Sequence, residues 1–262
     1  MLNEMKSELV EIYEARSILK SLVIKNLVGR YKNSVLGFAW HFVNPIILLC
    51  VYYLVFTQIR ATPIPDFWIY LACGLFPFHF MLNNLTSGSS CIVNNAGMVK
   101  KMYFPREIIV LSQVISTFII MLIGYIIVII GVAVSGYGMN ISVLFLLVLF
   151  ILNFVFTLGY TLVFSAATVY IRDIQYFLSS ISMAFFFLTP MYFMLDSIEG
   201  LFRVIALINP FTYFVESYHQ VVYYQCMPDT ITTIIVLFLS VISLIVGMLV
   251  FRKLRTGFAE RL

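Results

Sequence analysis

Long apolar runs, separated by short polar segments, make up most of the chain. Six of them lie at about 42–59, 67–85, 108–134, 143–169, 174–195 and 230–251. A helix of about 20 apolar residues crosses the roughly 30 Å hydrocarbon core of a bilayer. The pattern therefore predicts an all-α integral membrane protein with six transmembrane helices, in one transmembrane domain covering residues 1–262.

Ahead of the first run, residues 8–28 have the pattern of an amphipathic helix. Apolar residues recur on one side at Leu9, Ile12, Leu19, Val23 and Leu27, and charged residues take the other faces. We interpret it as a helix lying in the membrane interface, the alternative being a soluble helix packed on a partner. Residues 1–40 then form a cytoplasmic interface helix and connector, 41–252 the spans, and 253–262 a cytoplasmic tail.

The segment 196–226 is apolar only in short pieces. Its runs at 201–208 and 211–215 are too short to cross a bilayer, and Asn209-Pro210 separates them. We predict two re-entrant short helices between the fifth and sixth spans, with a surface loop as the alternative. Irregular backbone of this kind is tolerated in a membrane only where protein or water surrounds it.

The polar stretch NNAGMVKKMYFPRE (94–107) separates the second and third runs. It carries Lys100, Lys101 and Arg106, and Pro105 marks a break before the next helix. We predict a short helix outside the membrane over 95–103. It is interpreted as the place where a cytosolic partner pushes on the membrane part, the alternative being an ordinary topogenic loop.

Composition and charge support this topology. The chain is 62% hydrophobic and 11% charged, whereas soluble domains average about 25% charged residues. Fourteen of the sixteen Lys and Arg residues fall in segments that six spans place inside, so both termini are expected on the cytoplasmic side of the inner membrane. A net charge of +4 fits loops facing anionic membrane lipids rather than nucleic acid.

Sequence signatures of catalysis are missing. No G-x-x-x-x-G-K-[ST] phosphate loop or H-E-x-x-H motif occurs, and acidic residues are nearly absent from the span centres. A proton- or sodium-driven carrier usually keeps ionisable groups there. We therefore expect a transport subunit that is not an enzyme and holds no cofactor, with ATP and Mg bound by a separate cytosolic ATPase.

Two residue sets bear on the substrate. Aromatic side chains of the first and fifth runs offer flat faces on which sugar rings slide; these are Tyr52, Tyr53, Phe177, Phe185, Phe187 and Tyr192. Lipid contact or helix packing is the alternative for each ring. In the connector, Arg30, Tyr31, Lys32 and Trp40 would hold a lipid phosphate or diphosphate, unless they only anchor the chain at the interface.

Several motifs in order resemble a known family. They are RYKNSVLGFAWHFVNP (30–45), GLFPFHF (74–80), NNAGMVKKMYFPREI (94–108), YIRDI (170–174), LTPMYF (188–193) and NPFTYFVESYH (209–219). Together they are similar to the membrane subunit of type-2 ABC exporters of polysaccharides such as O-antigen, capsule or teichoic acid. The resemblance implies a homodimer with two cytosolic ATP-binding subunits, which exports a glycan carried on undecaprenyl diphosphate or a related lipid.

The resemblance also implies roles for particular residues. The resemblance implies that the interface helix contacts the ATPase, together with Asn95, Met98, Lys100, Lys101, Tyr103, Arg106 and Glu107. The first and fifth spans border the translocation path, and the connector around Arg30 and Lys32 senses the lipid diphosphate. The short helices form an outer gate that includes Asn209, Pro210, Phe211 and Tyr213.

Rival functions share parts of this pattern. A type-2 ABC permease for a drug or small lipid would have the same architecture. A membrane-embedded glycan-modifying enzyme should show a cluster of His or acidic residues at a membrane face, and none is apparent. The basic loop and interface helix disfavour a passive channel.

Overall fold

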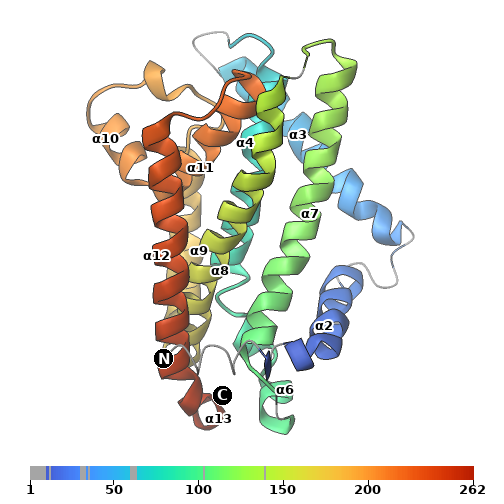
Figure 1. Ribbon diagram of the computed structural model, residues 1–262, viewed down its shortest axis with the longest axis vertical. Coiled ribbons are helices and arrows are strands. Elements are labelled where there is room, and N and C mark those ends of the chain that lie inside the picture. The colour runs from blue at the N-terminus through green and yellow to red at the C-terminus, as the bar shows by residue number, and fades with distance from the viewer. Residues whose placement is uncertain are drawn as a thin grey trace.

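The protein is an elongated helical bundle. The computed structural model describes residues 10–11, 13–29, 34, 36–59, 64–102, 104–138 and 140–262, and among these it contains helices and no strand. One end carries α10 (Gly200–Ile208) and α11 (Pro210–Tyr218), and the other carries α2 (Arg16–Gly29), α6 (Ala96–Lys101) and α13 (Phe258–Arg261) (Figure 1). The prediction of an all-α protein is confirmed.

Among the described residues, three helices are long and apolar enough to cross a membrane. They are α7 (Glu107–Val134), α8 (Leu146–Tyr170) with the 3₁₀ turn η2 (Ile141–Phe145) before it, and α12 (Thr230–Leu254). At 1.5 Å per residue, the 28 residues of α7 extend about 42 Å. These helices coincide with the predicted third, fourth and sixth runs to within a few residues.

Helices α8 and α12 approach each other closely through small residues. A Cβ atom on Gly159 would lie 2.2 Å from the carbonyl carbon of Ser243, and one on Gly247 would lie 2.3 Å from the carbonyl oxygen of Gly159. The Ser243 hydroxyl donates a 2.8 Å hydrogen bond to the Phe156 carbonyl. Small residues and hydroxyls at such a contact are typical of helix pairs in membranes.

Helix α4 (Phe67–Thr86) lies in the middle of the bundle. Fifteen of its twenty residues are buried, and it contacts α3, α7, α8, α9 and α11. Protein rather than lipid therefore surrounds this helix, which suits its Pro77 and the amides of Asn83 and Asn84. Asn84 Nδ2 donates to Thr117 Oγ1 of α7 at 2.7 Å.

Helices α3 (Trp40–Ile59) and α9 (Asp173–Leu188) are shorter apolar elements beside α4. The predicted fifth run extended to Leu195, but the helix stops at Leu188. The reason is Pro190, which disfavours helical backbone at the preceding residue; Thr189 is extended, with φ −91° and ψ 131°. The 16 residues of α9 therefore extend only about 24 Å.

Within the region predicted as an amphipathic helix (8–28), the structure has α2 at 16–29, which packs along the lower part of α7 (Figure 1). Its place in a membrane interface stays a prediction. The face that meets the bundle contains Ala15, Ile18, Leu19 and Leu22. Of the predicted stripe, Leu9 and Ile12 lie outside the described residues. Leu22, the one buried residue of α2, was not predicted, because a helix with apolar residues on two sides does not reveal which side meets protein.

The loop between α4 and α7 folds into two short helices, α5 (Cys91–Asn94) and α6. The single short helix predicted over 95–103 is thus shorter, and Tyr103 lies outside the described residues. At the opposite end, α10 and α11 are short helices at the two predicted positions. Their re-entry into a membrane stays a prediction. The remaining short elements are η1 (Gly37–Ala39), η3 (Leu195–Ser197), the π-helical turn η4 (His219–Tyr223) and η5 (Arg255–Gly257).

Candidate functional site

The basic helix α6 projects from the lower end of the bundle (Figure 1). Val99 is 5% exposed and anchors the helix, and Met98 packs partly against the core. Lys100 and Lys101 are both exposed in its last turn. The apolar side of the helix thus packs on the bundle while two lysines face the solvent. This geometry suits an acidic or polar partner surface.

Two predicted coupling residues, Arg106 and Glu107, contact the C-terminal tail. Glu107 forms an ion pair with Arg255, and Arg106 donates a hydrogen bond to the Arg255 carbonyl. The Arg106 guanidinium also lies 5.8 Å from the centre of the Phe258 ring. These contacts join the first turn of α7 to the chain that follows α12, so the two helices are mechanically connected at this end.

A pocket of about 780 Å³ opens beside this cluster. Residues preceding α2, Met102, the segment 104–107 and η5 line it, including Glu11, Glu14, Phe104 and Thr256. Carboxylates and guanidinium groups share its wall with apolar side chains. The sequence predicted that the interface helix and the basic loop serve one partner, and the structure places both around this pocket.

Asn95 connects the interface helix to the loop helices. Lys25 Nζ of α2 donates to Asn95 Oδ1 at 3.0 Å, and Asn95 Nδ2 donates to the Cys91 carbonyl at 2.8 Å. A displacement of α6 therefore acts on α2 as well as on α7.

In the connector, Arg30, Tyr31 and Lys32 lie outside the described residues. Trp40 is described, at the start of α3, and its indole Nε1 donates to the Ser34 hydroxyl at 2.8 Å. Trp40 thus lies at the entry of α3, where the predicted anchor or headgroup site was placed.

Aromatic side chains of α3, α4 and the α9 end form a cluster. Tyr52 lies 5.3 Å from Phe186 and 6.1 Å from His79, measured between ring centres. Phe56 stacks on Tyr192 at 4.2 Å with only 9° between the ring planes. Two predicted path residues, Tyr52 and Tyr192, therefore belong to one aromatic surface.

The other predicted path residues are divided. Tyr53, Phe177 and Phe187 are exposed, at 37%, 64% and 47%, whereas Phe185 points inward to Phe211, 5.0 Å away. Sequence reasoning left Phe56 and His79 out of the path. Phe56 follows Tyr52 by four residues, so helical spacing places both on one face of α3. His79 gave no such signal, because its neighbours come from other helices.

The predicted outer-gate residues form the joint between α10 and α11. Asn209 caps α11 by accepting from the Phe211 backbone N–H at 3.0 Å, and it donates to Thr189 Oγ1 at 2.8 Å. Pro210 takes the first turn, where a missing N–H costs nothing. The Tyr213 hydroxyl donates to the Leu207 carbonyl at 2.9 Å.

Phe211 is buried at 3% exposure, between rings of α4, α8 and α9. The joint is thus inserted into the bundle. Helix α10 differs: of its residues only Ala206 is buried, while Leu201 and Ile208 are 74% and 75% exposed.

Comparisons with known proteins agree over most of the chain. Residues 18–223 match the family described as ABC-2 type transporter. The chain is 30% identical to the O-antigen export system permease protein RfbA of Myxococcus xanthus, over 95% of this chain and 97% of the relative. Two proteins of the same name from Klebsiella pneumoniae are 29% and 30% identical, over 93% of this chain and 94% of each relative.

Proposed function

Because the chain belongs to the ABC-2 type transporter family, we propose that it is the membrane subunit of an ATP-driven exporter of a lipid-linked cell-surface polysaccharide. The resemblance carried by the sequence motifs is thereby confirmed at the level of the family. The observation that carries the proposal is the extent of the match, 95% of this chain and 97% of an O-antigen export permease. Bundle, basic loop and short outer helices all fall within it.

The proposed topology has six spans, α3, α4, α7, α8, α9 and α12, with both termini in the cytoplasm of an inner-membrane protein. The distribution of Lys and Arg supports it, since fourteen of sixteen fall inside. Polar residues are tolerated in α4 because other helices surround it as it crosses the membrane. Helices α10 and α11 then re-enter the outer leaflet. There they fill the part of the roughly 30 Å hydrocarbon core that α9, at about 24 Å, does not reach.

We place the path of the glycan along α3 and α9, at the interface with a second copy of the chain. Both helices expose large side chains, among them Val51, Leu54, Tyr176 and Phe177. Exposed Ser179 and Ser180 lie among them, which mixes hydrogen-bonding groups with rings. Sugars bind well to such surfaces, because ring faces stack on aromatic side chains while hydroxyls find polar partners.

The driving force would come from two cytosolic subunits that bind ATP and Mg. They would dock at Lys100, Lys101 and the neighbouring pocket, and would move α6. The Lys25–Asn95 hydrogen bond and the Glu107–Arg255 ion pair support transmission to α2, α7 and α12. Such coupling requires that the partner bind two conformations with different affinity.

The proposal is tested by purifying the chain with the ATP-binding protein encoded beside it. We expect a stable complex whose ATP hydrolysis is stimulated by the glycan-lipid, and loss of surface glycan when the gene is deleted. Stimulation by drugs or short lipids alone would indicate the rival cargo class. Unchanged surface sugars together with no nucleotide-hydrolysing companion would overturn the proposal.

A further inference from the structure

Two adjoining pockets form one groove along the cytoplasmic half of the bundle. The first, of about 410 Å³, lies between α2, α4 and α7, and the second, of about 570 Å³, lies between α3, α4 and α7. They share Asn83, Thr117 and Ile120. The groove is thus continuous from the interface helix to the middle of α3.

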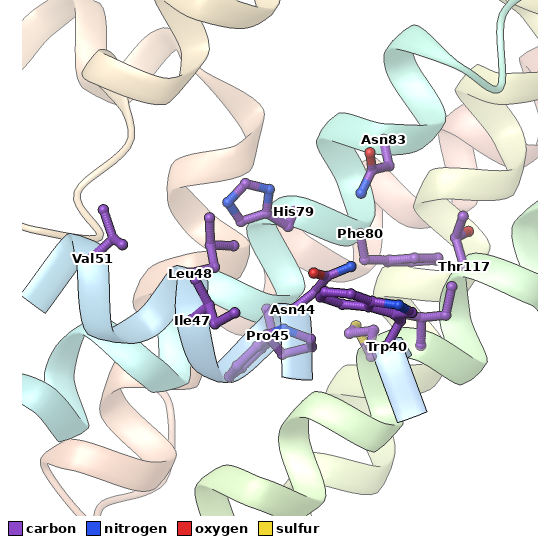
Figure 2. Close-up of a pocket in the computed structure, with 13 residues that line it drawn as sticks. Trp40, Asn44, Pro45, Ile47, Leu48, Val51, His79, Phe80, Asn83 and Thr117 are labelled. Carbon is purple, nitrogen blue, oxygen red and sulfur yellow. The ribbon is translucent and has the colours of Figure 1, made fainter. Parts of the chain in front are cut away.

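The lining changes from polar to apolar along the groove. The end at α2 is lined by Lys25, Gln113 and Ser87, among others. The far end is lined mainly by apolar side chains, such as those of Leu48, Val51 and Met121. Figure 2 shows Trp40, Asn83 and Thr117 gathered on one side of the second pocket, with Leu48 and Val51 on the other.

Polar groups in the groove retain hydrogen-bonding capacity. Within the described part of the chain, the side-chain amides of Asn83 and Gln113 make no hydrogen bond. The Nε2 atom of His79, on the groove wall, is buried without a partner among those residues. Lys25 contacts the neutral Asn95 amide, so its charge is not offset by a carboxylate there.

The dimensions match one leaflet of a bilayer. From Ser87 to Phe76 the groove follows eleven residues of helix, about 16 Å, against about 15 Å for half the hydrocarbon core. Helix α7 exceeds the full core by about 12 Å, and Gln113 lies about 9 Å from the start of the helix. When the excess lies at the Glu107 end, Gln113 is at headgroup depth.

From this geometry we infer that the groove binds one anionic phospholipid of the cytoplasmic leaflet. Its phosphate would accept hydrogen bonds from Lys25 and the Gln113 amide, since a cation close to the membrane surface attracts anionic headgroups. Asn83 would meet the ester region, and one acyl chain would follow Leu48 and Met121. The inference rests on the proposed topology for the choice of leaflet and is independent of the exported cargo.

The test uses the full chain purified with its natural partner and counts bound phosphatidylglycerol by native mass spectrometry. Lys25→Gln is expected to lower retention about fivefold, as loss of one lysine at a membrane surface does. Lys20→Gln, an exposed lysine of the same helix outside the groove, should retain the lipid. Equal retention by the two variants would overturn the inference.

A second pair of variants tests the apolar part. Ile120→Trp fills the groove and should displace the lipid, whereas Ile130→Trp, at a 57% exposed position of the same helix, should not. Asn95→Ala removes the Lys25 hydrogen bond but keeps the charge, and should retain the lipid. Lipid loss in the Asn95→Ala variant would show that retention depends on the position of α2 and not on the Lys25 charge, and would overturn the inference.

The competing occupant is the polyprenyl carrier of the glycan. Undecaprenyl phosphate should fail to displace phosphatidylglycerol at equal concentration, and inorganic phosphate should not compete. Displacement by either one would overturn the assignment to a phospholipid. Since lipid counting does not depend on transport, failure here leaves the export assay of the proposed function intact.

Discussion

His219 Nε2 donates a hydrogen bond to the main-chain carbonyl of Tyr70, 3.0 Å away, and the two rings stack at 3.8 Å. The carbonyl can only accept, so Nε2 carries the proton. His219 Nδ1 lies 3.6 Å from a Glu216 carboxylate oxygen. A Cβ on Gly74 would lie 2.8 Å from Nε2. The imidazole thus attaches the end of α11 to the middle helix α4.

We predict that His219→Ala destabilises the protein by about 2–4 kcal/mol, because it leaves a cavity and removes one of the hydrogen bonds that the buried Tyr70 carbonyl accepts. Thermal unfolding of the purified protein should show a midpoint lower by roughly 5 °C or more. His219→Gln keeps a donor and should lose less. Equal midpoints for His219→Ala and the unmodified protein would show that the contact contributes nothing.

Reversing the charge of Lys100 and Lys101 together should weaken the complex with the ATP-binding subunit by about tenfold or more, because like charges would then face each other at the interface. Membrane insertion should be unchanged, since both side chains are exposed. Co-purification and surface-glycan export measure the two effects.

Lys253→Glu provides the matched control, as an exposed lysine at the same end of the bundle. Normal export by the Lys100/Lys101 variant would remove α6 from the coupling mechanism.

Gly159→Ala should disrupt the α8–α12 contact. The new methyl group would lie 2.2 Å from main-chain atoms of Ser243, which cannot rotate away as a side chain could, so the helices must separate. We expect a loss of about 2 kcal/mol or more, seen as a lower unfolding midpoint. Gly97→Ala in α6, where nothing lies within 4 Å, should be neutral or slightly stabilising. A neutral Gly159→Ala would contradict this packing.

Thiol reactivity should distinguish Cys91 from Cys226. Burial of Cys91, in the loop between α4 and α7, raises the pKa of its thiol to about 12. Only the thiolate attacks a maleimide, so Cys91 stays protonated and unlabelled from pH 7 to 9 and becomes reactive only as the pH approaches its pKa.

Cys226 is exposed and should be labelled within that range. Peptide mass spectrometry after timed labelling measures both sites, and denaturation should make Cys91 react. Labelling of native Cys91 at pH 8 at the rate of Cys226 would show that the loop is open.

The sequence by itself determined where the helices lie. Apolar run length, Pro105, Pro190 and Asn209-Pro210 act locally, because helix formation and its interruption depend on neighbouring residues. The charge distribution likewise predicted which ends share a side. Pro190 likewise explains why α9 ends at Leu188 and not at the predicted Leu195, because the residue before a proline disfavours helical backbone.

Only the tertiary structure decided which faces of the helices pack against one another. Glu107 and Arg255 are 148 residues apart, and Phe56 reaches Tyr192 only because α3 and the end of α9 both lie against α4. The lipid groove depends on four helices at once. Helical periodicity defines the faces of one helix, but its rotation against its neighbours is set by side-chain packing, as the burial of Leu22 rather than Val23 in α2 illustrates.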